Sequence, residues 1–512
     1  MSYNQQEKIS SEIRNQLRSA LAFHRGGQLE DAVAIYQNVI QSWPESPETL
    51  ASLGAALIGL NRSKEAIIHL ERAITLRPYH ADTCFALAEA YRSEGLIENA
   101  FEAAKVGLQG NPNYLQGRVA MADTLLDMGR HDEARVAFEA IRSTNPKESR
   151  VHGKLGCFHF HVGEMEEAES LLCSAAQALP NDIDVHWHLA ALYLGQRRWV
   201  DGWPLYSWRW PIAKRVDPGT LVDIPPWQGA PSETDRLLIW GEQGLGDELM
   251  FSTCFPDVFK RIKPKNCFLT CDNRLANVFL RSFPGLEVIM INRLADFQTE
   301  VRIPECDVQI SSGDLPGLFR SRTQDFPKTL SSYKVDPRAK ELWAQRLAKL
   351  GDGLKVGIAW RGGSLERFKR SKSSEIGDWL EVFKTSGAQF INLQYGDCTE
   401  ELRGTPLYNF DDLDPISDPD SQMALIRNLN LVIQTSNASA HMAGLLNIPT
   451  WTVLPAIADW RWSFAGEECL WYPSMRLFRQ SEPGDWREVL GRVALELRNF
   501  IARQNDRARH QR

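Results

Sequence analysis

The fold of the first part of the chain is decided by residues 88–112, AEAYRSEGLIENAFEAAKVGLQGNP, because four of its positions recur every 34 residues. Proline returns at Pro44, Pro78, Pro112, Pro146 and Pro180. Two registers of small residues keep the same interval: Ala32, Ala66, Ala100, Ala134 and Ala168, and Gly54, Ala88, Ala122, Gly156 and Ala190. The fourth register is Gly27, Gly95, Gly129 and Gly163, with Asn61 in the second copy. Small residues at a fixed interval mark close approaches of two helix backbones, and glycine or asparagine supplies a turn with positive φ, so each unit predicts a helical hairpin.

This period and its registers resemble tetratricopeptide repeats over roughly residues 11 to 200. The resemblance implies a superhelix whose concave groove binds an extended peptide or a partner helix. We expect five repeats and a partial sixth over residues 11–215. The sixth copy contains WVDGWPLYSWRW, from Trp199 to Trp210, in place of the usual second-helix pattern. We expect these aromatic residues to pack the last hairpin against the region that follows.

Composition excludes several classes of function. With 65 acidic and 58 basic side chains, the net charge of −7 offers no basic surface for nucleic acid, so we expect no nucleic-acid partner. The first residues, MSYNQQEKISSEIRNQ, have no apolar signal-peptide core, and no run of about eighteen apolar residues could span a membrane. Nine cysteines without framework spacing fit free thiols in a reducing compartment. We therefore expect a cytoplasmic protein.

The remainder of the 512 residues is long enough for a second portion with its own core. From Arg236 the helical period gives way to short apolar runs, each followed by a turn and a helix, which is typical of parallel α/β units. The first run is RLLIW, followed by GEQGLGDELMFS. The same pattern of apolar run, turn and helix begins again at Lys355 with KVGIAW. We expect two Rossmann-like lobes, over residues 216–345 and 346–505.

Ligands bind open parallel sheets beyond the carboxyl ends of the strands, so the residues that follow each apolar run are candidates for one shared cleft. These residues are Gly246 and Asp247, Arg361 and Gly363, Gln394 and Tyr395, and Ser436 and Asn437. Two facing lobes of this kind are typical of a GT-B glycosyltransferase. The expected fold class is therefore an α-helical tetratricopeptide solenoid followed by an α/β GT-B domain with two Rossmann-like lobes.

Several segments are similar to bacterial glycosyltransferases that carry N-terminal tetratricopeptide repeats. The segments are GEQGLGDELMF, VGIAWRGG, FINLQYGD, SAHMAGLLNIPTW, and DWRW followed by WYPSMRLFRQ. Those proteins are related to heptosyltransferases and, in architecture, to protein O-GlcNAc transferases. Among them are flagellin glycosyltransferases, in which the repeats bind flagellin and the GT-B half transfers a nonulosonic acid such as pseudaminic acid. The resemblance spans essentially the whole chain, and it implies a nucleotide-sugar donor as substrate with no bound cofactor.

The resemblance also implies roles for the residues of the expected cleft. Asp247 matches the catalytic Asp of heptosyltransferases and would be the base for the acceptor hydroxyl, although a cap at a helix start is its alternative role. Glu242 and Glu248 are the other candidate bases. The expected donor-binding residues are Gly246, Arg361, Arg370, Lys372, Gln394, Ser436, Asn437, His441 and Arg461. Heptosyltransferases usually have Asp-Thr where this chain has Ser436 and Asn437, which favours a donor other than ADP-heptose.

Cationic side chains, rather than a metal, would stabilise the departing phosphate. The turn at residues 435–437 offers backbone N–H groups to phosphate oxygens, and Arg361, Arg370 and Lys372 can add positive charge. A solvated basic loop is the alternative reading of these three cations. We interpret the acidic stretch from Asp411 to Asp420 as capping and solvated residues, and we expect no metal site.

Three functions stay open at this point. The first is an enzyme that transfers a sugar from a nucleotide-activated donor to a Ser or Thr hydroxyl of a protein bound by the repeats, with flagellin as a candidate acceptor and partner. The second is the same enzyme with a lipid-linked or polysaccharide acceptor, the repeats docking a partner protein. The third is a scaffold without catalytic activity. The sequence leaves open the donor nucleotide, the sugar, the acceptor residue, the anomeric outcome and the oligomeric state.

Overall fold

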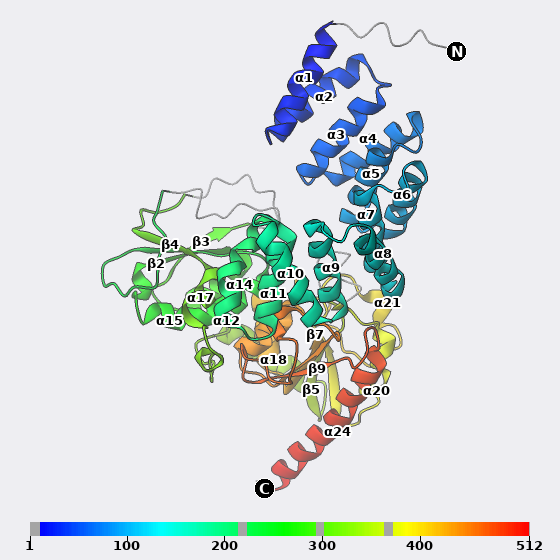
Figure 1. Cartoon of the computed structure of the whole chain (residues 1–512). Coiled ribbons are helices and arrows are strands. Elements are labelled where there is room, and N and C mark those ends of the chain that lie inside the picture. The colour runs from blue at the N-terminus through cyan, green and yellow to red at the C-terminus, as the bar shows by residue number, and fades with distance from the viewer. Residues whose placement is uncertain (1–10, 213–222, 293–301, 363–371, 511–512) are drawn as a thin grey trace. The chain divides into compact units, whose positions relative to one another are not determined.

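The computed structural model describes residues 11–212, 223–292, 302–362 and 372–510 (Figure 1). Contacts within the chain divide it into two compact units, Met1–Val185 and His186–Arg512. The first unit is helical, and the second contains two parallel sheets with helices around them.

The first unit is a tetratricopeptide solenoid of antiparallel helical hairpins, as expected from the 34-residue period. The hairpins are α1 (Ser11–Arg25) with α2 (Leu29–Ser42), α3 (Pro47–Gly59) with α4 (Ser63–Leu76), α5 (Ala81–Ser93) with α6 (Ile97–Gly110), α7 (Leu115–Asp127) with α8 (His131–Thr144), and α9 (Ser149–Val162) with α10 (Met165–Ala178). The five prolines of the repeat lie in the turns that connect one hairpin to the next. Each helix also packs on the following hairpin, so neighbouring units bury a continuous core.

The two small-residue registers lie where helices touch, as predicted. The five alanines from Ala32 to Ala168 are fully buried. A Cβ on Gly54 would lie 2.5 Å from Leu70 Cγ, and one on Gly156 would lie 2.7 Å from Leu172 Cγ. Because real Cβ contacts are not this short, the two glycines let the paired helices of their hairpins approach closely.

The turn register is confirmed by the backbone angles. Gly27, Gly95, Gly129 and Gly163 have φ between 73° and 88°, and Asn61 has φ of 61°. Glycine adopts this left-handed conformation without the steric penalty of a Cβ, and asparagine tolerates it better than most residues. The register therefore fixes the turn inside each hairpin.

The sixth copy lies mostly in the second unit, which begins at His186, and it departs from the register. It comprises α11 (Ile183–Gly195), α12 (Trp199–Gly202), the 3-10 helix η2 (Trp203–Trp208) and α13 (Arg209–Ile212). Its turn residue, 34 positions after Gly163, is Arg197, whose φ is 64°. The Arg197 side chain donates to Ser463 Oγ at 3.2 Å, and the backbone N–H of Phe464 donates to the Gly195 carbonyl at 2.9 Å. An arginine at the left-handed position thus attaches the end of the array to a loop near residue 463.

The aromatic residues of the sixth copy pack on the region that follows, as expected. Trp203 meets Trp460 edge to face with ring centroids 5.7 Å apart, and Trp199 lies 4.9 Å from Phe326. The predicted boundary at residue 215 falls within residues 213–222, outside the described part of the chain. The predicted domain limits stay predictions.

The first parallel sheet has the strand order β3-β2-β1-β4. Its strands are β1 (Leu237–Trp240), β2 (Cys267–Asp272), β3 (Glu287–Ile291) and β4 (Val308–Ser311). The accompanying helices are α14 (Leu245–Phe251), α15 (Phe255–Phe259), α16 (Ala276–Ser282), α17 (Leu315–Phe319) and α18 (Pro337–Ala348). The order reverses between β1 and β4, and such a reversal opens a crevice at the carboxyl ends of those strands.

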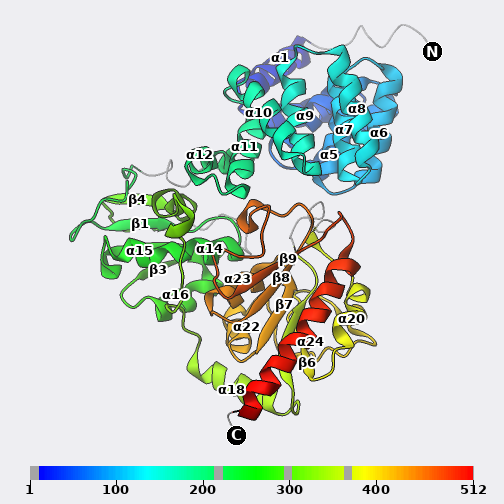
Figure 2. The ribbon, with the colours of Figure 1, turned by 60° about the horizontal axis from the view of Figure 1, so that its bottom comes forward.

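The second parallel sheet has the order β6-β5-β7-β8-β9 (Figure 2). Its strands are β5 (Leu354–Ala359), β6 (Ala388–Asn392), β7 (Leu431–Thr435), β8 (Thr450–Leu454) and β9 (Met475–Arg479). The accompanying helices are α20 (Leu380–Phe383), α21 (Thr399–Leu402), α22 (Pro419–Ile426), α23 (Ala438–Leu445) and α24 (Trp486–His510). Apolar residues of α24 such as Val489 and Val493 share one core with Val356 and Ile433 of the sheet. The order reverses between β5 and β7, and the carboxyl ends of strands at such a reversal are where open parallel sheets usually bind ligands.

A valine at position 54 should destabilise the first unit. In Gly54→Val, the added atoms would overlap Leu70, and overpacking of a core costs about 1–3 kcal/mol of unfolding free energy. Urea unfolding followed by circular dichroism measures the loss. Ala55→Val is the matched control, because Ala55 is exposed on the same helix, and it should cost about 0.5 kcal/mol from helix propensity alone. Equal losses in the two variants would contradict the close approach of α3 and α4.

Candidate functional site

The carboxyl-end loops of the two sheets meet within the second unit. Gly246, near the start of α14 after β1, lies against His441 of α23, and a Cβ on this glycine would be 2.8 Å from His441 Cδ2. The same Cβ would be 3.6 Å from Ala438 Cα. Glycine at position 246 therefore allows the amino-terminal turns of α14 and α23 to pack directly against each other.

The loops after β5 and β7 also contact each other. Asn437 caps α23, because its Oδ1 accepts from the Ala440 backbone N–H at 3.3 Å, and its Nδ2 donates to the Arg361 carbonyl at 3.2 Å. A Cβ on Gly362 would lie 2.2 Å from the Ser436 carbonyl oxygen. The three predicted loops, near residues 247, 361 and 437, are thus brought into one cluster at the carboxyl ends of the strands.

An arginine lies at the centre of this cluster. Arg461 Nε donates to Asp247 Oδ1 at 2.8 Å, Nη1 donates to Asp459 Oδ1 at 2.9 Å, and Nη2 donates to Gln243 Oε1 at 2.9 Å. Its guanidinium also lies 4.6 Å from the ring centroid of Trp460. Lys372 Nζ is 3.5 Å from the second carboxylate oxygen of Asp459. Charge pairing raises the pKa of Arg461 and lowers that of Asp459, against the opposing effect of burial.

Asp247 lies at the start of α14, as the capping role requires, and it also faces the cluster. It is the third residue of α14, where its Oδ2 accepts from the backbone N–H of Gly244 at 3.3 Å. The other oxygen faces the cluster and binds Arg461. Whether Asp247 is a catalytic base stays a prediction.

The two alternative bases have structural partners instead. Glu248 accepts from the backbone N–H of Asp272 with both carboxylate oxygens, at 3.3 and 3.1 Å. Glu242 receives two hydrogen bonds from Arg209, at 2.7 and 2.9 Å, and one from the Gly313 backbone N–H at 2.7 Å. Both glutamates are buried, and they fix the loops after β1, β2 and β4.

The Arg209–Glu242 pair attaches the sixth helical copy to this site. Arg209 also binds Asp314 at 2.8 Å, so one buried guanidinium joins α13 to the loops after β1 and β4. Its pKa is raised because the pairing with Glu242 outweighs the effect of burial. Tyr206 accepts from Gln243 Nε2 at 3.0 Å and places a second residue of this segment against the loop that carries Asp247.

His441 is buried at the packing point of α14 and α23. Its ring stacks on Trp462 with centroids 5.1 Å apart, and Nδ1 shares a hydrogen bond of 2.8 Å with the Tyr472 hydroxyl. Burial lowers the pKa of His441 to about 4. Trp462 in turn donates from Nε1 to Ser436 Oγ at 2.8 Å, which fixes the predicted phosphate-binding turn.

The remaining predicted donor-binding residues lie around the loop after β5. Gln394 Oε1 accepts from the backbone N–H groups of Trp360 and Arg361, at 3.0 and 2.8 Å, so it shapes this loop. The guanidinium of Arg361 pairs with Glu401 of α21 at 3.1 Å rather than with the Asp247 cluster. Arg370 and Gly363 lie within residues 363–371, outside the described part of the chain.

The acidic stretch from Asp411 to Asp420 is accounted for by capping and pairing, as interpreted from the sequence. Asp418 caps α22 through the Ser421 N–H at 2.9 Å, and Asp420 forms a two-bond pair with Arg281 at 3.0 and 2.6 Å. Among the residues that the structure describes, no three His, Cys, Asp or Glu side chains form a candidate metal site.

Sequence reasoning did not single out Tyr206, Gln243, Arg209 or Tyr472. Their roles depend on contacts with residues distant along the chain, which no spacing rule records. Gln243 lies in the glycine-rich turn GEQGLGD, which is a local signal of unusual backbone conformation, and its φ in the structure is 63°.

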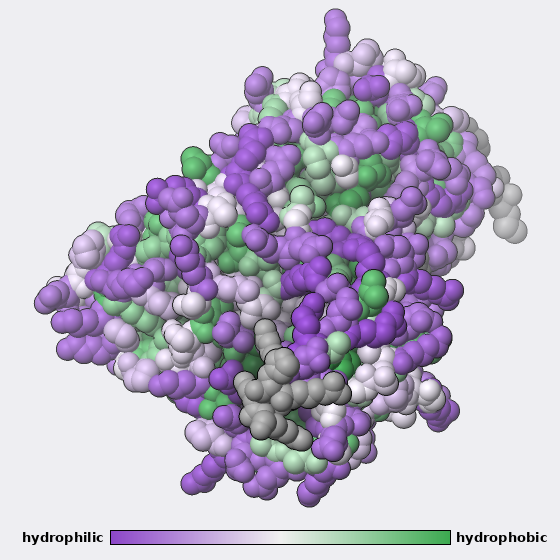
Figure 3. Space-filling model, turned by 90° about the horizontal axis from the view of Figure 1, so that it is seen from below, coloured by the Kyte–Doolittle hydropathy of each residue, from purple (hydrophilic) through white to green (hydrophobic). Residues whose placement is uncertain are grey.

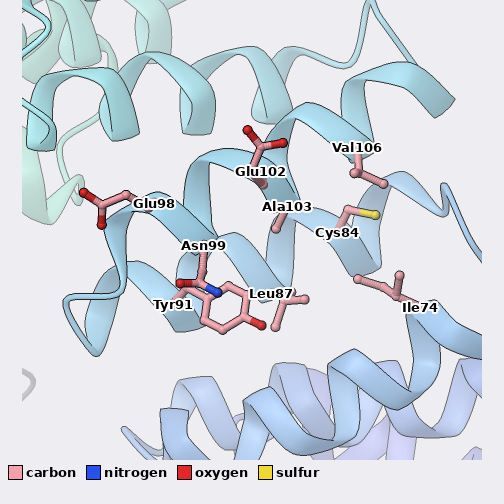
Figure 4. A pocket seen from close by; sticks show the side chains of 9 residues that line it. All are labelled: Ile74, Cys84, Leu87, Tyr91, Glu98, Asn99, Glu102, Ala103 and Val106. Carbon is pink, nitrogen blue, oxygen red and sulfur yellow. The ribbon is translucent and has the colours of Figure 1, made fainter.

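A separate hollow lies in the repeat array, between α4, α5 and α6 (Figure 4). Its volume is about 460 Å³, with Cys84, Leu87 and Tyr91 of α5 among its buried lining and the exposed Glu98 and Glu102 of α6 beside them. The Tyr91 hydroxyl donates to Glu71 at 2.5 Å, and burial together with this bond raises the pKa of Tyr91 to about 12.

No helix in the described ranges is long and apolar enough to cross a membrane. The face drawn in Figure 3 is mostly hydrophilic, and its hydrophobic side chains form small separate patches.

The chain is a tetratricopeptide-repeat protein with a C-terminal region of parallel sheets and helices. The family model described as tetratricopeptide repeat matches residues 17–81 and 119–183, and that of anaphase-promoting complex, cyclosome, subunit 3 matches residues 60–141. Protein FlbA of Caulobacter vibrioides is 29% identical over 502 residues, which cover 94% of this chain and 84% of that protein. TPR repeat-containing protein YpiA of Bacillus subtilis is 23% identical over 177 residues, 34% of this chain and 41% of that protein.

Solved structures are similar over the repeats. TTC0263, a thermophilic TPR protein of Thermus thermophilus, has 20% identity and a TM-score of 0.31, with 34% of this chain and 94% of that chain covered. YrrB, a TPR protein described as having an unusual peptide-binding site, has 19% identity and a TM-score of 0.28, with 33% and 88% covered.

Removal of the Arg209 guanidinium should destabilise the second unit strongly. Arg209→Met leaves the Glu242 carboxylate buried without its charge partner, and breaking a buried pair in this way costs about 3–5 kcal/mol of unfolding free energy. Tryptophan fluorescence during urea unfolding measures the loss. The control is Arg322→Met, whose exposed pair with Asp325 should leave stability almost unchanged. A similar small effect in both variants would contradict a structural role for the Arg209 pair.

The lowered pKa of His441 predicts a pH dependence of stability. The unfolded imidazole takes up a proton near its ordinary pKa of about 6.5, whereas the folded one resists protonation down to about 4. Stability from this group is therefore complete above about pH 6.5 and is lost as the pH falls toward 4, by about 3 kcal/mol in total. Chemical unfolding of wild type and His441→Gln from pH 7.5 to 4.5 measures it. The stability difference between them should shrink as the pH falls, and a constant difference would count against a buried neutral histidine.

Proposed function

We propose that this protein is a metal-independent GT-B glycosyltransferase, which transfers a sugar from a nucleotide-activated donor to a Ser or Thr hydroxyl of a protein bound by its repeats. One observation carries the proposal. The loops after β1, β5 and β7, at the order reversals of two parallel sheets, form one cluster around Asp247, Asn437 and Arg461. Such reversals are where open parallel sheets bind nucleotides and other ligands.

The donor phosphate would bind at the amino-terminal turn of α23. The turn at Ser436 and Asn437 presents backbone N–H groups and the positive end of the helix, which attract phosphate oxygens. Gln434 Nε2 and Thr435 Oγ1, at the end of β7, are buried without a hydrogen-bond partner among the described residues. A ligand with acceptor oxygens near this strand end would satisfy such groups. Arg461 and Lys372 supply positive charge nearby.

The chemistry would need a base and a stabilised leaving group. As the acceptor oxygen bonds to the anomeric carbon, its proton passes to the Asp247 carboxylate. The bond between that carbon and the phosphate oxygen breaks, and the negative charge on the departing phosphate is stabilised by Arg461, Lys372 and the α23 terminus. A helix terminus contributes only about 1 kcal/mol, so the cationic side chains must contribute most of the stabilisation.

The repeats would bind the acceptor protein. A tetratricopeptide solenoid presents an extended surface suited to peptide segments. The resemblance to flagellin glycosyltransferases favours flagellin as acceptor and a nonulosonic acid as sugar. We therefore include in the proposal flagellin as acceptor, a nonulosonic acid as sugar and a cytoplasmic location.

Two assays test the proposal. In thermal unfolding with UDP, GDP, ADP or CMP, one nucleotide should raise the midpoint, because ligands that bind the native state stabilise it. Intact-mass spectrometry of purified flagellin incubated with the chain and the matching nucleotide-sugar should show addition of the sugar. Asp247→Asn should reduce the transfer rate by about 10²-fold or more, the usual contribution of a general base.

Asp420→Asn is the matched control, since Asp420 pairs with an arginine outside the cluster and should retain transfer. No midpoint shift with any nucleotide and no transfer would favour the scaffold. Transfer to a lipid-linked or polysaccharide sugar, without transfer to protein, would favour the alternative acceptor. Full transfer by a folded Asp247→Asn variant would exclude this residue as the base.

A further inference from the structure

Arg461 joins the two halves of the site through one guanidinium. Its Nε and Nη2 edge faces the loop after β1, where Asp247 lies at 2.7–2.8 Å and Gln243 at 2.9 Å. Its Nη1 binds Asp459 on its own loop at 2.9 Å. The Arg461 side chain is only 14% exposed, so these contacts form largely out of water. The same guanidinium is therefore bound both to the predicted base and to the side of the site that would receive phosphate.

Among the described residues of the cluster, two cations face two carboxylates. The carboxylates of Asp247 and Asp459 face the cations Arg461 and Lys372, and His441 beside them is neutral because burial lowers its pKa. A phosphate group that enters adds negative charge to a partly buried site, where uncompensated charge is costly. A cation that turns from its carboxylate partner to the phosphate would compensate this charge.

The pair with Arg461 also obstructs Asp247, the predicted base. The carboxylate oxygen of Asp247 that faces the cluster accepts from Arg461 Nε at 2.8 Å, so the arginine occupies this oxygen. Proton transfer from an acceptor hydroxyl requires a free carboxylate oxygen within hydrogen-bond reach. Movement of Arg461 away from Asp247 would free this oxygen to accept from the hydroxyl.

We infer that Arg461 exchanges partners during the reaction: the donor phosphate takes its guanidinium from Asp247, and this exchange frees the base once donor is bound. The inference rests on the proposed function, and it makes Arg461 a positioning residue for Asp247. It explains how donor binding would precede activation of the acceptor. In the chain without donor, the base stays paired.

The backbone around Arg461 is built to stay in place while the side chain changes partner. Asp459 accepts from the Arg461 backbone N–H at 3.1 Å and caps the short turn Trp460–Trp462. The next residue, Ser463, has φ of 58° and is bound by Arg197 at 3.2 Å. The bond from Nη1 to Asp459 lies within this loop, so only the edge facing Asp247 needs to be exchanged.

A double-mutant cycle on nucleotide affinity tests the inference. Calorimetry uses whichever of UDP, GDP, ADP and CMP stabilises wild type, with Asp247→Asn, Arg461→Gln and the double variant, each shown by thermal unfolding to be folded. Asp247→Asn should bind the nucleotide about tenfold more tightly than wild type, because its competing carboxylate is gone. Arg461→Gln should bind at least about tenfold more weakly, and adding Asp247→Asn to it should restore less than about twofold.

Asp420→Asn is the matched control, because its pair with Arg281 also joins α16 beside the first sheet to α22 beside the second. It should change affinity less than about twofold; a gain equal to that of Asp247→Asn would mean that looser packing of the two halves, not release of Arg461, raises affinity. A gain from Asp247→Asn that persists in the Arg461→Gln background would overturn the exchange. Arg461→Lys replaces Arg461→Gln if the latter fails to fold, with the same expected loss of coupling. If wild type binds none of the four nucleotides, the result contradicts the proposed function. If wild type binds a nucleotide but the effects of Asp247→Asn and Arg461→Gln on affinity are independent, the result contradicts the partner exchange and leaves the proposed function standing.

Discussion

The ion pair between Arg461 and Asp247 links two sequence segments that lie more than two hundred residues apart. Asp247 opens the helix after β1, and Arg461 lies on the loop after β8. Neither side chain could reach the other unless α14 and α23 packed with their amino-terminal turns together, which depends on glycine at position 246. The same packing places His441 against Gly246, where His441 is buried.

A second set of contacts, made by the sixth helical copy, holds the loops of the cluster in place. The sixth helical copy departs from the repeat register so that its side chains can reach the sheets: Arg209 fixes Glu242, and Arg197 fixes the loop after Arg461. Tyr206 binds Gln243 and stacks edge to face on Trp460 at 5.2 Å. The end of the helical array is thus part of the wall of the candidate site.

The repeats could be predicted well because each register reports a local constraint. Alanine at a helix contact and glycine in a left-handed turn recur wherever the same packing recurs, and the structure places them so. The sixth copy shows the limit: Arg197 occupies the left-handed position because its side chain binds residues 463 and 465, and the local sequence contains no trace of that contact.

The site could be predicted only in outline. The rule for parallel sheets identified the loops that carry Asp247, Arg361 and Asn437, and these loops do meet. It could not predict which side chains face one another, since that depends on rotamers and on how the two sheets pack. Arg361 accordingly pairs with Glu401, whereas Arg461 takes the central position.

A crystal structure of the full chain with the nucleotide that stabilises it tests the central claim most directly. We predict nucleotide phosphate at the turn formed by Ser436 and Asn437, with the Arg461 guanidinium on a phosphate oxygen and Asp247 unpaired. Nucleotide bound elsewhere, or bound here with the Arg461–Asp247 pair unchanged, would contradict it.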